Sequence, residues 1–177
     1  MTLGFIGCGN MASAIISGIL EKEIVKKEEI FASTKSEVSA QKITDALGIS
    51  CSTDNLAVAK KADYLFLCIK PQFCGDVAEE IRDCLPDGQV LISIIAGKNL
   101  DWLQEKFGTD KKIIRTMPNT PALVGEGITG VCPNQFVSPD EIRQVLTLLR
   151  SFGRADVVTE PILDVVGAVS GSSPAFV

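Results

Sequence analysis

Short apolar runs alternate with amphipathic stretches from the first residue of the chain onward. The run at 64–69 is apolar at nearly every position, and the run at 90–95 is apolar except at Ser93, which is typical of strands covered on both faces. Strands are predicted at 3–6, 30–32, 49–53, 64–69, 90–95, 112–116, 128–132 and 155–158. Strands of this kind separated by helices predict a doubly wound, mostly parallel α/β sheet with helices on both faces.

Residues that favour helix ends mark the predicted helices between these strands. Ser36 begins a helix that ends at Gly48, and Ser138, followed by Pro139 and Glu141, begins another. A serine caps free amide groups at a helix start, and a glycine adopts the left-handed conformation beyond the last turn. Helices are predicted at 11–20, 36–48, 55–61, 73–85, 100–107 and 138–152.

A further apolar helical stretch begins at Ile162, outside the alternation of strands and helices. A chain of 177 residues holds little more than one domain. We therefore expect a dinucleotide-binding domain at 1–160 and the first helix of a second, helical domain at 161–177. The sequence ends at Val177 inside an apolar stretch with no polar tail, so we expect the native chain to continue past this residue.

Composition and charge exclude several classes of protein. The chain has 22 acidic and 17 basic side chains, a net charge of −5 and no histidine. The acidic balance argues against nucleic acid or an anionic membrane as a partner. The lack of histidine excludes Ser-His-Asp systems and histidine-ligated metal sites, and no metal is expected. The six cysteines form no C-x-x-C pair, and no signal peptide or spanning apolar run is visible, so we expect reduced thiols in a cytoplasmic protein.

The first predicted strand leads directly into a glycine-rich turn. Gly7, Gly9 and Ala12 stand in the pattern G-x-G-x-x-A, the dinucleotide-binding fingerprint of Rossmann-type folds. Gly7 permits the tight turn, Gly9 lets backbone amides approach a pyrophosphate, and Ala12 lets the helix pack close to the strand. A strand before the turn and a helix after it supply the context that this fingerprint requires. The alternative is a tight turn without a ligand.

The residues after the second predicted strand bear on the choice between NAD(H) and NADP(H). NAD enzymes usually carry an acid here that binds the ribose hydroxyls, whereas this chain has Ser33, Thr34, Lys35 and Ser36 and no acid before Glu37. Hydroxyls and an ammonium suit a 2′-phosphate, so we expect NADPH as the cofactor and NADH as an alternative. The other interpretation is that Lys35 is a solvated surface residue and Ser36 only caps the helix.

Several loops should meet at one edge of the sheet, because the carboxyl ends of parallel strands lie together there. Lys and Asn side chains in these loops can bond ribose and amide groups, and a small Ala-Gly pair leaves room for a nicotinamide ring. Each loop alone is also compatible with ordinary turn chemistry, but together they predict a cofactor trough. The loops contain Asp54 and Asn55, then Lys70, Pro71 and Gln72, then Ala96 and Gly97, and finally residues 117–121.

Several motifs resemble those of the pyrroline-5-carboxylate reductase family. They are FIGCGNMASAI at the start, LCIKPQ after the fourth predicted strand, ISIIAG, RTMPNTPALVGEG and SGSSPAF, and they extend over essentially the whole chain. Members of this family reduce 1-pyrroline-5-carboxylate to L-proline with NADPH or NADH, the last step of proline biosynthesis. The resemblance implies an oxidoreductase that forms a homodimer or a higher homo-oligomer through a helical C-terminal domain.

The resemblance also implies roles for individual residues. Glu160 matches a position in the substrate site, whereas the family's main substrate-binding loop has no counterpart in this sequence. The sequence departs from the family at Ser173, where glycine is usual, and at Gly167, where threonine is common. The cofactor-binding residues would be Ile6, Gly7, Cys8, Gly9, Asn10 and Met11 around the pyrophosphate, Ser33, Lys35 and Asn55 near the adenosine half, and Cys68, Ile69, Lys70, Pro71, Ile94, Ile95 and Ala96 along the trough.

The expected chemistry is hydride transfer to a C=N bond, for which the cofactor supplies the reactivity and the protein supplies orientation. A protonated imine accepts hydride without a histidine acid, so we assign no catalytic residue in this chain. Arg115 lies within a predicted strand, and we expect it to form a structural salt bridge or helix contact. Two alternatives stay open. One is another NADP-linked reductase, of the hydroxyacid dehydrogenase or coenzyme F420-linked type, and the other is a dinucleotide-binding module without chemistry.

Overall fold

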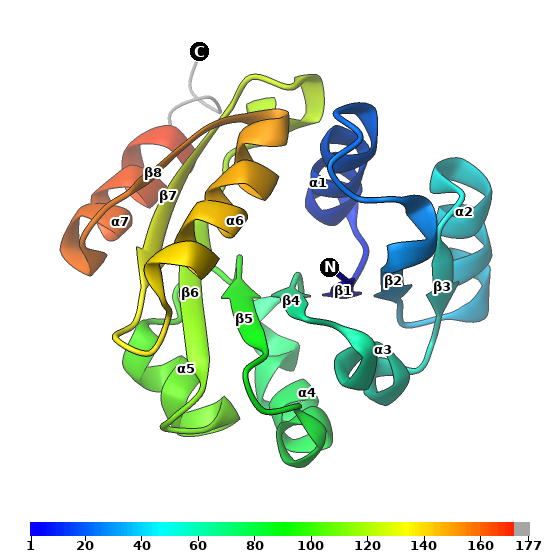
Figure 1. The fold of residues 1–177 in the computed structure, drawn as a ribbon, viewed down its shortest axis with the longest axis horizontal. Helices are drawn as coiled ribbons and strands as arrows, with labels where there is room; N and C mark the ends of the chain where they lie inside the picture. The colour runs from blue at the N-terminus through cyan, green and yellow to red at the C-terminus, as the bar shows by residue number, and fades with distance from the viewer. Residues whose placement is uncertain (172–177) are drawn as a thin grey trace.

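The structure, a computed structural model, describes residues 1–171 of the chain. Within these residues one eight-stranded sheet crosses the molecule in the order β3-β2-β1-β4-β5-β6-β7-β8 (Figure 1). The chain moves outward in opposite directions from β1, whose neighbours are β2 and β4. The strands are β1 (Leu3–Ile6), β2 (Ile30–Ser33), β3 (Ser50–Ser52), β4 (Tyr64–Leu67), β5 (Val90–Ser93), β6 (Lys112–Met117), β7 (Gly127–Pro133) and β8 (Gly153–Val157).

Most neighbouring strands run parallel. The pairs from β3 to β6 are all parallel, and β8 is parallel to β7. β7 is antiparallel to β6, with Arg115 opposite Cys132. The connection between these two strands contains only the 3-10 helix Thr120–Val124, which is too short for the crossover that a parallel partner needs. The predicted Rossmann-type, doubly wound, mostly parallel sheet is confirmed.

Two layers of helices cover the sheet (Figure 1). Successive strand residues point to opposite faces. Phe5 and Phe66 therefore stack in one core, with ring centroids 4.6 Å apart, whereas Ile6 and Leu67 belong to the other core. The first core lies under α1 (Asn10–Glu21), α2 (Glu37–Leu47) and α6 (Pro139–Leu149), and the second lies under α3 (Asn55–Lys61), α4 (Cys74–Ile81) and α5 (Leu100–Phe107).

The helix ends carry the predicted capping residues. Ser36 accepts a hydrogen bond from the backbone amide of Ser39, and Gly48 ends α2 in the left-handed conformation with φ 70°. Ser138 and Glu141 form a capping box at the start of α6. These predictions are confirmed, and they succeed because a cap depends on neighbours within a few residues.

Some predicted lengths are wrong where tertiary partners decide them. The strand predicted at 64–69 ends at Leu67, because β1 and β5 on either side end level with it at Ile6 and Ser93. The last turns of two predicted helices tighten instead into 3-10 geometry. Short 3-10 helices occupy Lys27–Glu29, Pro71–Phe73, Arg82–Cys84 and Arg150–Phe152.

The helix α7 (Glu160–Val166) follows β8 and packs on β6 and β7, and it is followed by a π-helical turn at Gly167–Gly171. Gly130 of β7 allows this contact, because a Cβ there would lie 2.5 Å from Leu163 Cδ1. A boundary between domains at residue 160 stays a prediction.

The departure from the family pattern at Ser173 lies outside the described residues.

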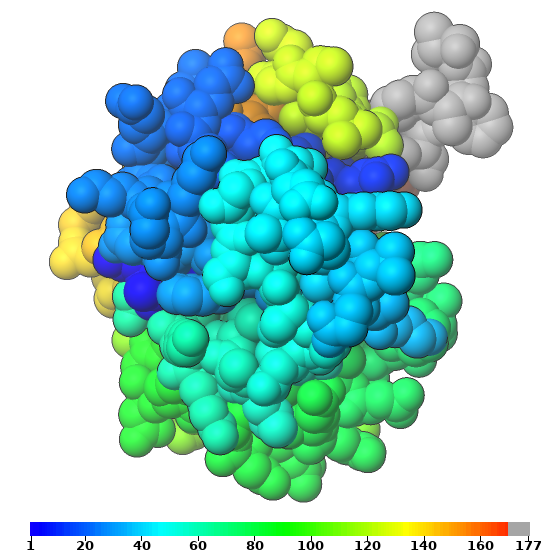
Figure 2. Space-filling view, turned by 90° about the vertical axis from the view of Figure 1, so that its right-hand side faces the viewer, coloured from blue at the N-terminus to red at the C-terminus, as the bar shows by residue number. Residues whose placement is uncertain are grey.

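Figure 2 faces the β3 edge of the sheet, where the segments around α2, β3 and α3 form the surface in light blue and cyan, with the green segment of α4 below them. Among the helices of residues 1–171, none is long and apolar enough to cross a membrane.

Candidate cofactor-binding site

The turn after β1 requires glycine at its first position. Gly7 has φ 84°, in the left-handed region, and its amide donates to the carbonyl oxygen of Ser33 at 3.0 Å. A Cβ on Gly7 would lie 2.5 Å from the carbonyl oxygen of Cys68, closer than any real side chain approaches. The turn therefore lies tightly between β2 and the loop after β4, at the point where the strand order reverses.

The start of α1 is open and carries no negative charge. Gly9 caps the helix without a side-chain hydrogen bond, and the first turn contains no acidic residue. A Cβ on Gly9 would meet no heavy atom within 4 Å. The first amide groups of a helix have no partner within it and carry a partial positive charge, so this end of α1 fits a phosphate group. Ala12, 1% exposed, packs α1 against the sheet.

A cavity of about 400 Å³ lies directly beside this turn. It is formed where β1 and β2 end and where α3 and α4 begin, and its walls carry both polar and apolar side chains. The lining residues are Ile6, Gly7, Ser33, Thr34, Lys35, Thr53, Asn55, Ile69, Phe73, Asp76, Val77 and Glu80. The size and the mixed lining suit the adenosine half of a dinucleotide.

A chain of hydrogen bonds joins three elements across this cavity. The Ser33 hydroxyl at the end of β2 donates to Asn55 Oδ1 at 2.7 Å, and Asn55 Nδ2 at the start of α3 donates to Glu80 Oε2 of α4 at 2.8 Å. Ser33 is fully buried, whereas Glu80 is exposed. The hydroxyl needs an acceptor and the carboxylate needs a donor, so the orientation of the Asn55 amide is fixed.

One cation lines the same cavity. Lys35 is exposed, and its Nζ lies 4.9 Å from the centre of the Phe73 ring. The contact is a cation–π interaction of a kind that contributes little at an exposed site. The ammonium therefore lies near the cavity in contact with an aromatic ring and not in an ion pair with a carboxylate.

The structure brings many of the predicted cofactor residues together. Ile6, Gly7, Ser33, Lys35, Asn55 and Ile69 all line the cavity. Gly9, Asn10 and Met11 stand at the start of α1, and Lys70 and Pro71 lead into the 3-10 helix that carries Phe73. Ile94, Ile95 and Ala96 follow β5 at the same edge of the sheet but do not line this cavity.

Two predicted residues are thiols, of which Cys8 is buried and Cys68 is half-buried. Cys8 is 9% exposed, and burial raises the pKa of its thiol to about 11. Burial also raises the pKa of the Cys68 thiol well above its usual value, and the neighbouring Cys8 adds to this effect. Both groups stay neutral at physiological pH, so they act as small apolar side chains behind the turn. All six cysteines are free thiols.

Glu160, the predicted substrate residue, lies away from this cavity and is part of an ion cluster. Arg115, 3% exposed, donates from Nη1 to Glu160 Oε1 at 3.0 Å and from Nη2 to Asp164 Oδ1 at 2.6 Å. The amide of Leu100 also donates to Glu160 Oε1, at 2.8 Å. The structural salt bridge expected of Arg115 is confirmed, and it joins β6, α5 and α7.

Sequence reasoning missed five residues of the cavity wall, namely Thr53, Phe73, Asp76, Val77 and Glu80. The last four belong to the segment at 73–81, where the sequence predicts only a helix. Their shared face could have been found from the helical spacing of 73, 76, 77 and 80, but nothing local shows which way that face points.

A second groove, of about 530 Å³, lies between α1 and the 3-10 helix Thr120–Val124. It reaches from Asn10 in the glycine turn to Gly125, and includes Ser13 and Ser17. The RTMPNTPALVGEG motif therefore lies beside the start of α1, although more than a hundred residues separate them in sequence.

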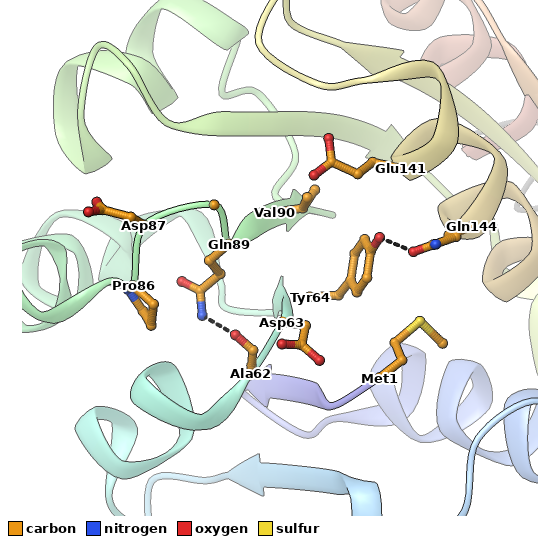
Figure 3. Close-up of a pocket in the computed structure, with 11 residues that line it drawn as sticks. Met1, Ala62, Asp63, Tyr64, Pro86, Asp87, Gln89, Val90, Glu141 and Gln144 are labelled. Atoms are coloured by element: carbon orange, nitrogen blue, oxygen red, sulfur yellow. Dashed lines mark hydrogen bonds between the residues drawn. The ribbon is translucent and has the colours of Figure 1, made fainter.

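A third cavity, of about 380 Å³, lies at the opposite end of the strands (Figure 3). Its polar groups bond to one another: the Tyr64 hydroxyl donates to Gln144, and Gln89 Nε2 donates to the carbonyl oxygens of Ala59 and Ala62 at 2.7 and 2.6 Å. It contains none of the predicted cofactor residues. In parallel sheets ligands bind at the carboxyl ends of the strands, so this cavity is not the candidate site.

Comparison with known proteins identifies similar chains. The family model described as NADP oxidoreductase, coenzyme F420-dependent, matches residues 2–97. Pyrroline-5-carboxylate reductases of Escherichia coli (strain K12) and Staphylococcus saprophyticus are 43% and 38% identical to the chain over 175 and 177 residues, 99% of its length. The resemblance predicted from the motifs is confirmed. The chain spans about 65% of the length of these relatives.

Solved structures agree with this comparison. A pyrroline-5-carboxylate reductase from Coxiella burnetii superposes with a TM-score of 0.94 at 30% identity, and the match covers 99% of this chain and 65% of that one. The Plasmodium falciparum pyrroline carboxylate reductase, solved with NADP bound, gives a TM-score of 0.89 at 34% identity and covers 99% and 64%. A prephenate dehydrogenase from A. aeolicus, at 15% identity and a TM-score of 0.77, shares the fold alone.

Proposed function

Since the chain belongs to the family described as NADP oxidoreductase, coenzyme F420-dependent, we propose that it binds NADP(H) and serves pyrroline-5-carboxylate reduction. In this reaction 1-pyrroline-5-carboxylate is converted to L-proline, with NADPH as the cofactor and NADH as an alternative. The protein would then be a cytoplasmic enzyme of proline biosynthesis with a small-molecule substrate, and neither nucleic acid nor a membrane would be a partner.

The observation that carries this proposal is the 43% identity to the Escherichia coli reductase over 99% of the chain. A glycine turn alone is shared by many dinucleotide-binding proteins. The turn supports the proposal physically, because the uncapped start of α1 and the open space at Gly9 fit a diphosphate.

Each part of the site has a role in this proposal. Gly7 and Gly9 would let the backbone approach the diphosphate, and Lys35 would bind the 2′-phosphate through a charge-assisted hydrogen bond. The loop at 94–96 would lie along the nicotinamide, with Ala96 leaving room for the ring. The dihydronicotinamide would supply the hydride when bound, and the residues along the nicotinamide would orient the ring toward the imine carbon.

Only Glu160 of this chain is proposed to lie in the substrate site. Glu160 would face the substrate while its Oε1 is held by Arg115 and Leu100, so it would act as a fixed carboxylate and not as a mobile acid. We propose that a helical segment like that of the longer relatives completes the substrate site and forms a homodimer or higher homo-oligomer. We assign no role in proton transfer to any side chain within 1–171.

The test is proline-dependent reduction of NADP⁺, followed as absorbance of NADPH at high pH. The 177-residue chain should bind nucleotide without turnover, because the proposed substrate site is shared with the helical segment. A fusion of this chain to the remaining third of the Escherichia coli reductase should turn over. Turnover by the 177-residue chain alone would overturn the need for that segment, and a folded fusion that binds NADPH without turnover would contradict the reductase proposal.

A second candidate is another NADP-linked reductase, because the family model covers only residues 2–97 and is named for coenzyme F420. The same fusion would then reduce coenzyme F420 or a hydroxyacid's keto form but not 1-pyrroline-5-carboxylate. Binding without any of these reactions would favour a dinucleotide-binding module.

A further inference from the structure

The adenosine cavity contains a carboxylate that the sequence places far from the glycine turn. Enzymes that use NAD usually carry an acid at the end of β2, where it accepts hydrogen bonds from the ribose hydroxyls. Here β2 ends at Ser33 and is followed by Thr34 and Lys35. Glu80 of α4 lines the same cavity as these three residues. An acid is therefore present in this cavity, although it comes from a different element.

Glu80 is tied to the cavity by a bonded partner. Asn55 Nδ2 donates to its Oε2 at 2.8 Å, and Asn55 Oδ1 accepts from the Ser33 hydroxyl at 2.7 Å. Ser33 is fully buried at the end of β2. This chain of bonds links the carboxylate to the last residue of β2, the strand whose end lies at the adenosine ribose in dinucleotide-binding folds. Glu80 therefore supplies a hydrogen-bond acceptor to the same cavity.

The charges in the cavity oppose one another. Lys35 is its cation, whereas Asp76 and Glu80 are both acids that line it. The Lys35 ammonium lies over the Phe73 ring and, within residues 1–171, forms no ion pair with either acid. An ammonium favours a 2′-phosphate, and a carboxylate close to that phosphate repels it.

We propose that Glu80 is a specificity-determining residue that lets this site accept NADH beside NADPH. Its carboxylate accepts a hydrogen bond from the unphosphorylated adenosine ribose of NADH and repels the 2′-phosphate of NADPH, while Lys35 acts in the opposite sense. This inference rests on the proposed function, because it concerns the same nucleotide site. It also explains why the residues after β2 alone give an incomplete account of cofactor choice.

The test compares binding of NADH and NADPH to the whole chain by isothermal titration calorimetry. Glu80→Gln keeps an oxygen that can accept from Asn55 Nδ2 but removes the charge. A unit charge within about one Debye length of a doubly charged phosphate in water, partly screened by salt, changes an equilibrium about three- to tenfold. Glu80→Gln should therefore tighten NADPH binding about three- to tenfold, and it should weaken NADH binding.

Two further variants sharpen the test. Glu79→Gln removes the same charge from the adjacent exposed position of α4, which does not line the cavity, and should change neither affinity. Lys35→Met should weaken NADPH binding more than NADH binding, whereas Lys42→Met on exposed α2 should not. Melting temperatures of all variants would verify that they fold.

The outcomes separate this inference from the proposed function. If both nucleotides bind and the NADPH-to-NADH affinity ratio of Glu80→Gln equals that of Glu79→Gln, the role of Glu80 is overturned and the proposed function stands. If neither nucleotide binds to the unchanged chain, the proposed function and this inference fail together.

Discussion

At the residue scale, two glycines of one turn have different physical requirements. Gly7 adopts φ 84° against the carbonyl of Cys68, whereas Gly9 has φ −90° and open space around it. The first is required by the fold, because a side chain there would strain the backbone and collide with it. The second is required only by a ligand that approaches the backbone.

This difference gives a first prediction. Gly7→Ala should lower the free energy of unfolding by at least about 2 kcal/mol, from left-handed strain and the collision together. Gly9→Ala should lower it by no more than about 1 kcal/mol, the cost of alanine at a helix N-cap. Urea denaturation measures both values. Equal costs for the two variants would show that the turn does not have the geometry described.

Individual residues also differ in whether their roles can be predicted from the sequence. The roles of Gly7 and Gly9 follow from a local pattern, because the turn, the strand and the helix are contiguous. Glu80 could not be predicted, since it reaches Asn55 across 25 residues and from a different helix. Only the packing of α4 against α3 places this exposed carboxylate in the lining of the cavity.

At the scale of elements, α7 is held on the sheet by one buried cation. Arg115 bonds both Glu160 and Asp164, and Glu160 also accepts the amide of Leu100 at the start of α5. Glu160 is 30% exposed and Asp164 is 64% exposed. A carboxylate that is more buried and accepts from two donors contributes more to the free energy of unfolding than a carboxylate that is mostly solvated.

The second prediction follows from this ordering. Glu160→Ala should destabilise the chain by about 1–3 kcal/mol, since it leaves the buried guanidinium with one partner and the Leu100 amide with none. Asp164→Ala should cost less than about 1 kcal/mol. Hydrogen exchange of the α7 amides, with the urea midpoint, would show this order, and the reverse order would contradict it.

Elements differ in how far the sequence predicts them. Caps at Ser36, Gly48 and Ser138 are local and were predictable, and they occur as expected. Strand ends were less predictable, because Leu67 ends β4 only where its neighbours also end. The direction of β7 depends on the length of the connection before it, which apolar periodicity does not report.

At the scale of the whole molecule, burial raises the pKa of several thiols, which lie in strands, in loops and in α4. Burial raises the pKa of Cys8 to about 11 and also raises those of Cys51, Cys68, Cys74 and Cys132. The unfolded thiols ionise at their ordinary pKa, near 9.0. The unfolded state therefore loses protons at a lower pH than the folded state.

The third prediction concerns alkaline pH. The free energy of unfolding should be unaffected by these thiols below about pH 8. It should fall as the pH rises from about 9 to 11, because in this range the thiols ionise in the unfolded state and stay protonated in the folded state. Cys8 alone should lower the free energy of unfolding by about 2 kcal/mol near pH 10.5, relative to its value below pH 8. Urea denaturation across this range measures the loss. Cys8→Ala should decline less steeply than the unchanged chain, and an identical slope would contradict the assignment to Cys8.

The arrangement of the whole molecule brings the site together. The strand order reverses at β1, so the glycine turn, the end of β2 and the loop after β4 meet at one edge. Alternation of apolar strands and helices is enough to predict this edge. It is not enough to predict the whole cavity wall, because part of the wall is made by exposed side chains such as Phe73, Asp76 and Glu80, whose positions follow from no apolar pattern.

The central claim is that the open start of α1 binds the diphosphate of a nicotinamide dinucleotide. Isothermal titration calorimetry of NADPH against the unchanged chain and against Gly9→Ala tests it most directly. We expect saturable binding to the unchanged chain and at least about tenfold weaker binding to Gly9→Ala, with little change in melting temperature. Absence of both heat and thermal shift for the unchanged chain, or equal affinity for the two proteins, would contradict the claim.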